Sequence, residues 1–247
     1  MANGGNFNTK ESKMRKYVAM SILVIGMIVG CGSSSSDGVQ NASKQKPKTK
    51  QELCEQGDGE ACLYIGNLYY NGEGVEKDYQ KANEYFKKGC DLENGMSCGN
   101  LGYNYSEGNG VERDYQKANE YFKKGCDLEN GISCGNLGYS YSKGEGVEKD
   151  YQKANEYFKK GCDLENGQSC NNLGYSYYEG EGVEKDYQKA NEYFKKGCDL
   201  ENGMSCNNLG YSYYEGEGVE KDYQKANEYF KKACDLGYEK ACKFVEN

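Results

Sequence analysis

Cysteine thiols are the side chains of this sequence best suited to chemistry. Twelve of the 13 cysteines fall into six pairs, the members of each pair are eight residues apart, and the pairs recur every 36 residues. The pairs are Cys54/Cys62, Cys90/Cys98, Cys126/Cys134, Cys162/Cys170, Cys198/Cys206 and Cys234/Cys242. Two adjacent thiols can oxidise to a disulfide, whereas four thiolates can bind zinc. The remaining thiol, Cys31, lies outside this array.

The absence of histidine limits the other chemistry open to the chain. It excludes imidazole general bases, Ser-His-Asp and Cys-His catalysis, and the common histidine-based zinc sites. A thiolate zinc site would need two cysteine pairs from different repeats, and no C-x-x-C spacing is present. We therefore favour disulfides over zinc and expect no metal or other cofactor.

The charge of the chain argues against one class of partner. Its formal net charge is -8 and its pI is about 4.9. Proteins that bind nucleic acid need basic patches that displace counterions from phosphates. We therefore expect no nucleic-acid partner.

The cysteine pairs are embedded in a repeat, and the repeat predicts the fold. The 18 residues from Asp78 to Gly95, DYQKANEYFKKGCDLENG, return unchanged at Asp114, Asp150 and Asp186, and a shortened copy begins at Asp222. A fixed period of this length is typical of a solenoid of stacked helix pairs, in which each repeat buries its apolar face against its neighbours. The predicted fold class is an all-α αα-repeat solenoid.

Apolar spacing divides each repeat into two helices. Helix A follows residue 96, with a stripe of Cys98, Leu101, Gly102 and Tyr105, and a glycine loop at 108–111 ends it. Helix B starts after Asp114, a suitable N-cap, with a stripe of Tyr115, Ala118, Phe122 and Cys126. Residues 129–131 should end it, with Asn130 or Gly131 in the left-handed conformation. Remnant helices are expected at 49–56 and 238–246.

Glycines recur in the middle of helix A, where each costs about 1 kcal/mol relative to alanine. Their repetition predicts that helix A packs closely on a neighbour. They are Gly66, Gly102, Gly138, Gly174 and Gly210.

The two helices place each cysteine pair at a joint between repeats. Cys90 lies near the end of one helix B, and Cys98 lies in the first turn of the next helix A. The intervening turn reverses the chain, which can bring the two Cα atoms within the ~4.4–6.8 Å that a disulfide requires. Closing such a short loop removes ~2.5 kcal/mol of unfolded-state entropy.

The repeat resembles the Sel-one-like repeat (SLR), a relative of the tetratricopeptide class. The pattern is carried by Leu101, Gly102, Tyr105, Gly108, Gly110, Val111, Asp114, Lys117 and Ala118. With a cysteine pair at every joint, residues 51–247 look like the Helicobacter cysteine-rich protein family. The resemblance implies a right-handed superhelix. It also implies slow hydrolysis of β-lactams, because members of that family are described as penicillin-binding β-lactamases.

A β-lactam hydrolase of the serine type would want an S-x-x-K motif together with S-D-N and K-T-G. Ser140 and Lys143 match the first motif in one repeat, and the other two motifs are missing. They are the weak catalytic candidates of this sequence, and whether it encodes an enzyme stays open.

The N-terminal residues are typical of an exported lipoprotein. Basic residues precede an apolar run at 17–30, which predicts a signal peptide over residues 1–31 with a possible true start at Met14. The run ends Ile-Val-Gly-Cys31, which resembles a lipobox, so Cys31 is the expected lipidation site; the alternative is an ordinary signal peptide. Residues 32–50 should be a flexible tether. We expect an exported protein, secreted or anchored to the outer membrane.

The predicted solenoid at 51–247 divides into repeats at 59–94, 95–130, 131–166, 167–202 and 203–238 and a half-repeat. In helix A, residues 96, 100, 103, 104 and 107 lie opposite the core stripe and should face the concave side. The expected ligand-binding residues there are Asn100, Tyr103, Asn136, Tyr139, Asn172, Tyr175, Asn208 and Tyr211. Such a groove suits a peptide, protein or cell-wall ligand bound by a monomer. The alternative is a solvated polar face of a recently duplicated array.

Overall fold

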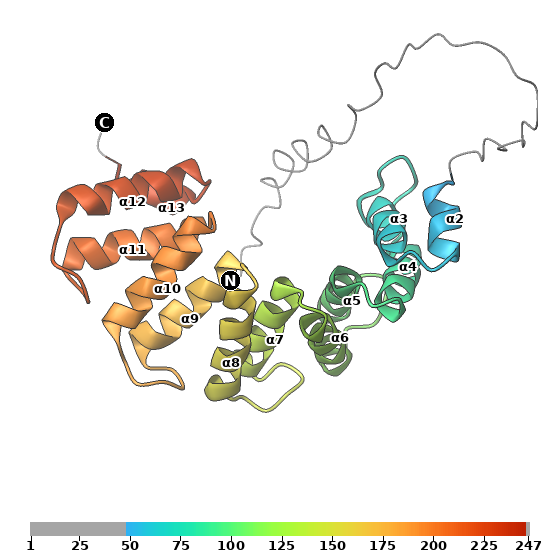
Figure 1. Ribbon diagram of the computed structural model, residues 1–247, viewed down its shortest axis with the longest axis horizontal. Helices are drawn as coiled ribbons and strands as arrows, with labels where there is room; N and C mark the ends of the chain where they lie inside the picture. Colours follow the sequence, from blue (N-terminus) through green and yellow to red (C-terminus); the bar gives the residue numbers. More distant parts are fainter. Residues whose placement is uncertain (1–47, 246–247) are drawn as a thin grey trace, which may run out of the picture. The chain divides into compact units, whose positions relative to one another are not determined.

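The computed structural model describes residues 48–245, and within this range every regular element is a helix (Figure 1). The signal peptide, Cys31 and residues 32–47 lie outside the described residues. The helices are α2 (Lys50–Glu55), α3 (Gly59–Asn71), α4 (Tyr79–Asp91), α5 (Gly95–Glu107), α6 (Tyr115–Asp127), α7 (Gly131–Lys143), α8 (Tyr151–Asp163), α9 (Gly167–Glu179), α10 (Tyr187–Asp199), α11 (Gly203–Glu215), α12 (Tyr223–Asp235) and α13 (Glu239–Cys242). None of them is long and apolar enough to cross a membrane.

The predicted all-α solenoid of helix pairs is confirmed. The A helices are α3, α5, α7, α9 and α11, and each packs mainly on the B helix that follows it, one of α4, α6, α8, α10 and α12. Each B helix then packs on the next A helix, so the pairs succeed one another in chain order (Figure 1). The short helices α2 and α13 stand where the two remnant helices were expected.

Side-chain caps set the start of each helix. The carboxylate of Asp114 accepts a hydrogen bond from the Lys117 backbone N–H at the start of α6 (3.0 Å). The amide oxygen of Asn94 does the same for the Ser97 N–H at the start of α5 (2.8 Å). Each accepts from a backbone donor that has no partner inside the helix. The A helices end at a left-handed glycine, such as Gly108 with φ 78°.

The left-handed residue after helix B differs from the prediction. Neither Asn130 nor Gly131 adopts it; Glu129 does, with φ 60°. Asn130 is extended, because its side chain caps the next A helix, and Gly131 is already the first residue of that helix. Because Asn130 is used as the cap of the next helix, the left-handed conformation falls on the residue before it, Glu129.

The core repeats with the sequence. In the third repeat, Ala154 and Phe158 of α8 pack with Leu173 of the following A helix, and all three are buried. A Cβ on Gly138 of α7 would lie 2.7 Å from Cδ1 of the Phe158 ring. The close approach expected from the mid-helix glycines is confirmed, because only glycine leaves room for the phenylalanine of the paired B helix.

A second contact holds neighbouring repeats together, and the sequence reasoning missed it. The buried Asn119 of α6 donates a hydrogen bond from Nδ2 to the Glu145 carbonyl, in the loop of the next repeat (2.6 Å). In the same loop, a Cβ on Gly146 would lie 2.5 Å from the backbone of Tyr115. The loop glycine therefore lets the next repeat sit directly on the start of the preceding B helix.

All six predicted disulfides are formed. The Cα–Cα distances within the pairs are 4.6–4.8 Å, inside the range that disulfides require. Five of them link the end of a B helix, or of α2, to the start of the next A helix, and the sixth links the end of α12 to the last residue of α13. Within residues 48–245, no cluster of three or more potential ligands could hold a metal ion. The bonds, which replace the thiolate zinc site considered for these cysteines, are Cys54–Cys62, Cys90–Cys98, Cys126–Cys134, Cys162–Cys170, Cys198–Cys206 and Cys234–Cys242.

The burial of the cysteines corrects the expectation that they are the side chains best suited to chemistry. Ten of the twelve are 0% exposed, so neither solvent nor a ligand reaches their sulfur atoms. On the A helices, the buried cysteines are Cys62, Cys98, Cys134, Cys170 and Cys206. Each of these five sulfur atoms lies 3.6–3.8 Å from the carbonyl oxygen of its partner, a packing contact because an oxidised sulfur has no hydrogen to donate. The ten buried cysteines therefore cross-link the joints and are shielded from ligands, whereas Cys234 is half-buried and Cys242 is exposed.

Candidate functional site

The A helices line the inner side of the solenoid's curve. Consecutive A helices contact one another along the array, from α3 with α5 to α9 with α11, whereas consecutive B helices are in weaker contact. Elements on the inside of a curved stack lie closer together than elements on its outside. The exposed surface of the A helices is called the inner face below.

Exposed apolar side chains gather on the inner face. Eleven large hydrophobic residues of the described chain are exposed, and nine of them belong to A helices. The nine are Tyr64, Met96, Tyr103, Ile132, Tyr139, Tyr175, Met204, Tyr211 and Tyr214. A continuous exposed apolar surface marks an interaction site more often than scattered single residues do.

The predicted tyrosine row lies on this face. Tyr103, Tyr139, Tyr175 and Tyr211 expose 36–48% of their surface, one on each of four consecutive A helices. Partial burial raises the pKa of Tyr103, and the nearby Glu107 carboxylate raises it further. Burial and then Glu179 raise the pKa of Tyr175 in the same way. The phenols of Tyr103 and Tyr175 therefore stay protonated at neutral pH and can donate hydrogen bonds to a ligand.

The asparagine row is less open than the tyrosine row. The four asparagines are half-buried, and three of them have partners within the solenoid. Asn100 donates to Asn67 Oδ1 (3.3 Å), Asn208 donates to Asn171 Oδ1 (2.9 Å), and Asn172 accepts from Gln168 (2.9 Å). Asn136 is also half-buried, and like Asn100 it lies between a glycine and a leucine in the sequence. Two of these amides, those of Asn100 and Asn208, therefore link neighbouring A helices in addition to being partly exposed.

One residue was placed on the wrong face. Asn104 was expected on the concave side, but it is fully buried. Its Nδ2 donates to Asn83 Oδ1 of the preceding B helix (2.6 Å), so the amide is satisfied inside the repeat joint. It lies seven residues after the buried Ser97, and two helical turns place both on the same side.

The serine and lysine of the S-x-x-K match are separated by burial. Ser140 is only 4% exposed, in the last turn of α7. Lys143 is exposed, and its ammonium lies 5.6 Å from the centre of the Tyr139 ring. The two residues share a helix, but the serine faces the core and the lysine faces solvent.

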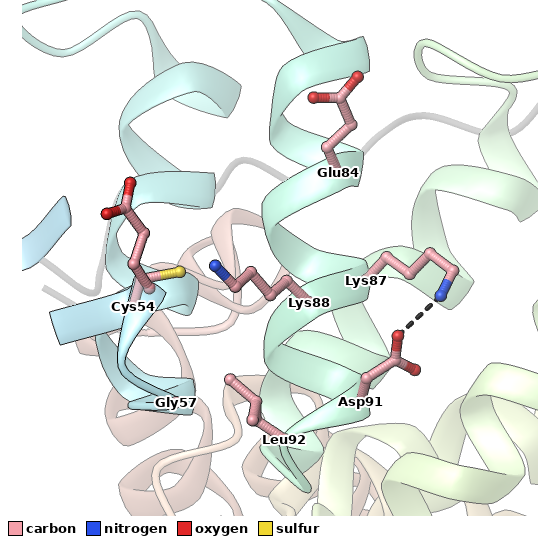
Figure 2. A pocket seen from close by; sticks show the side chains of 8 residues that line it. Cys54, Gly57, Glu84, Lys87, Lys88, Asp91 and Leu92 are labelled. Carbon is pink, nitrogen blue, oxygen red and sulfur yellow. Dashed lines mark hydrogen bonds and ion pairs between the residues drawn. The ribbon is translucent and has the colours of Figure 1, made fainter. Parts of the chain in front are cut away.

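Small pockets beside the B helices are lined mainly by charged residues, some of which are paired with one another. One of about 350 Å³ lies between α2 and α4, and Figure 2 shows Lys87 hydrogen-bonded to Asp91 at its edge (2.7 Å). Equivalent pockets recur beside Asp127, Asp163 and Asp199, each paired with the lysine four residues before it. These pockets expose charged rather than apolar side chains, whereas the inner face gathers the exposed apolar ones, so we take the inner face as the candidate site.

Comparisons with known proteins agree with this architecture. The Sel1 repeat family model matches residues 59–94, 95–130, 132–166, 167–202 and 203–238. No match was found among curated proteins.

Among solved structures, a protective antigen of uropathogenic Escherichia coli with an SLR fold is 32% identical, with a TM-score of 0.71; the match covers 78% of this chain but only 41% of that one. A Sel1 repeat protein of Oxalobacter formigenes is 25% identical, with a TM-score of 0.71, covering 79% and 80%. Cysteine-rich protein B of Helicobacter pylori is 38% identical over 53% of this chain and 94% of its own, with a TM-score of 0.45.

Proposed function

Because the chain belongs to the Sel1 repeat family, we propose that it is an exported, disulfide-stapled solenoid that binds an extended peptide or protein segment on its inner face. Proteins with these repeats generally bind protein partners. Exposed apolar side chains are concentrated on the A helices, whereas the B helices expose mainly charged side chains. This contrast is the main support for binding on the inner face.

The dimensions of the inner face suit an extended chain. Packed helices lie roughly 8–10 Å apart, and a polyproline-II segment rises about 3.1 Å per residue, with side chains three residues apart on the same side. Successive A helices therefore meet about every third residue of a bound segment. Tyr103, Tyr139 and Tyr175 would contact side chains at that spacing. A cell-wall fragment that carries a peptide stem could span the same distance across successive A helices.

Six disulfides support a location outside the reducing cytosol, since such bonds persist in oxidising compartments. We propose that residues 1–30 direct export and that lipid on Cys31 anchors the protein. Mass spectrometry of the mature N-terminus tests this directly. A lipidated Cys31 as first residue is expected, and a mature chain that retains residues before Cys31 would contradict the anchor.

Peptides selected from a random library on the oxidised protein test the binding face. Replacing Tyr103, Tyr139 and Tyr175 together by serine should weaken selected peptides by at least about a hundredfold, because aromatic anchors dominate such interfaces. The matched control replaces the exposed Glu120, Glu156 and Glu192 of the B helices by serine and should change affinity little. Loss of binding only in the control would refute the assignment.

β-Lactam hydrolysis, which the family resemblance implied, is the alternative to a purely binding role. It is measured with nitrocefin on oxidised protein against a reduced and unfolded control. A rate abolished by Ser140→Ala would support the serine, whereas an unchanged rate would remove it as a catalytic candidate.

A further inference from the structure

A position in the last turn of every A helix takes one of two very different side chains. It is Tyr in the first, fourth and fifth repeats and Ser in the second and third: Tyr70, Ser106, Ser142, Tyr178 and Tyr214. Each tyrosine packs edge-on against the tyrosine that begins the next B helix, with ring centres 5.1–5.3 Å apart and planes inclined by 67–68°. Three repeats thus show that a tyrosine side chain fits at this position, against the first tyrosine of the next B helix.

Tyr178 shows the full set of contacts. Its ring meets the edge of Tyr187, and its hydroxyl donates to Oε2 of Glu217, in the loop of the next repeat (2.7 Å). Lys185 lies 5.8 Å from the ring centre. The ring also stacks beside Tyr175 of the inner-face row, at 6.5 Å. A phenol at this position therefore joins the exposed tyrosine row to an aromatic ring and a carboxylate acceptor.

The two serine repeats keep the surroundings but lack the phenol. The hydroxyls of Ser106 and Ser142 donate hydrogen bonds within their own helices, to the backbone carbonyls of Tyr103 and Tyr139 respectively (2.8 Å each). Within residues 48–245, the ring of Tyr115 has no aromatic or cationic partner. Tyr151, its equivalent one repeat later, has only the Lys149 ammonium, 4.5 Å from its ring centre.

The acceptors are in place as well. Relative to the two serines, Glu145 and Glu181 occupy the loop position that Glu217 occupies relative to Tyr178. Both are half-buried, and in the part of the chain that the structure describes neither carboxylate makes a hydrogen bond or ion pair. Each serine repeat therefore offers a half-buried ring and an unpaired acceptor where Tyr178 finds its two partners.

We propose that these places are two subsites for tyrosine side chains of a bound segment: Tyr115 with Glu145, and Tyr151 with Glu181. The proposal rests on the inner face being the binding surface, since both subsites adjoin Tyr103 and Tyr139. A neutral phenol satisfies the glutamate acceptor, a phenyl ring leaves it unpaired, and a phosphorylated tyrosine is repelled by it. Subsites one repeat apart select two tyrosines about three residues apart in a segment of polyproline-II conformation, in which side chains at that spacing lie on the same side.

N-acetyl-tyrosinamide is the probe, titrated into oxidised protein while NMR follows the rings of Tyr115 and Tyr151. The wild-type chain should show two saturable sites. Ser106→Tyr should leave one, and Ser106→Tyr with Ser142→Tyr should leave none, because the protein's own ring fills each place. Tyr178→Ser should add a third. N-acetyl-phenylalaninamide should bind about tenfold more weakly, since it cannot donate to a charged acceptor.

The serine-to-tyrosine variants are well matched, because three other repeats already hold tyrosine there. Probe binding that is unchanged in the double variant would overturn the subsites, as would equal binding of the phenylalanine probe. Library-selected peptides separate this outcome from failure of the proposed function. Peptides that depend on the inner-face tyrosines but tolerate the double variant would refute the subsites alone. Peptides bound elsewhere would refute the inner face, whatever the probe shows.

Discussion

Helix A and helix B of this repeat differ in how much their sequences vary and in which side chains they expose. The B helix is identical in four repeats, buries the same alanine, asparagine, phenylalanine, glycine and cysteine each time, and exposes lysine and glutamate. The A helix varies at exposed positions such as Met96, Ile132 and Gln168, and at one buried position where Asn104 is replaced by Ser140, while its buried cysteine is kept in every repeat. We infer that B helices hold the array together and that A helices carry its differences. Substitutions can test each half of that division.

The largest contrast is expected between Phe158→Ala and Tyr139→Ala. Phe158 is 4% exposed in the repeat core, so its truncation should lower the free energy of unfolding by about 3–5 kcal/mol. Tyr139 is 47% exposed, so its truncation should change stability by roughly 0.5 kcal/mol or less while weakening ligand binding. Urea unfolding of the oxidised proteins measures both. Equal losses of stability would contradict the division between the helices.

Removing one staple should be the next largest effect. Cys162→Ala with Cys170→Ala frees the joint between α8 and α9 and should lower the free energy of unfolding by ~2.5 kcal/mol. Comparing urea unfolding of this variant and the parent, both fully oxidised, gives the value. If the transition does not move, the joints are held by helix packing and the disulfides add nothing.

A buried amide should have a smaller effect that differs in sign between joints. Asn104→Ser removes the donor to Asn83 and should destabilise the protein by about 1–3 kcal/mol. Ser140→Asn makes the reverse change one repeat later, where Asn119 Oδ1 is buried without a partner, and should stabilise by about 1 kcal/mol. Thermal unfolding measures the pair. Destabilisation by both would show that the later joint has no room for the amide.

Acid should affect the starts of the B helices more than those of the A helices. Hydrogen bonding from the Lys117 backbone N–H holds the pKa of Asp114 below its usual value, and the equivalent aspartates behave alike. A lowered folded-state pKa means a contribution that is present above the unfolded value of about 3.9 and is lost as the pH falls through the folded value.

Asn94, which caps an A helix, does not titrate in this range. Amide exchange compared at pH 6 and pH 3, corrected for the intrinsic rates, should therefore show faster opening at the B-helix starts than at the starts of α5, α7, α9 and α11, which asparagines cap. Asp114→Asn, which keeps a capping oxygen, should remove the difference at α6. Equal opening of both helix types in acid would assign the loss to general charge repulsion.

Much of the architecture could be predicted because it repeats. A period of 36 residues, two apolar stripes and a fixed cysteine spacing were sufficient for the helix pairs and the six disulfides. Single residues with two possible roles were harder. Asn130 is as suited to a left-handed turn as to a cap, and only the packed chain shows that its side chain is used as the cap. Asn104 was expected on the concave side because it lies opposite the apolar stripe of its helix, and only the packed chain shows that Asn83 is its buried partner.

The site was predictable only in part, for a related reason. The tyrosine row follows from helical spacing, so its exposure could be expected. The hydrogen bond from Asn119 to the Glu145 carbonyl joins residues that are 26 apart in the sequence. It depends on how the loop of the next repeat folds, so no local sequence pattern predicts it. The identity of a ligand depends on the partner's own sequence, which the periodicity of this chain does not contain.

The proposed function places the binding of partners on the A helices. The most direct test is to place a photoreactive group in a library-selected peptide, cross-link it to the oxidised protein and identify the labelled residues by mass spectrometry. Labels on Tyr103, Tyr139, Tyr175 and their neighbours in α5, α7 and α9 are the expected result. Labels confined to the exposed faces of α6, α8 and α10 would contradict the account.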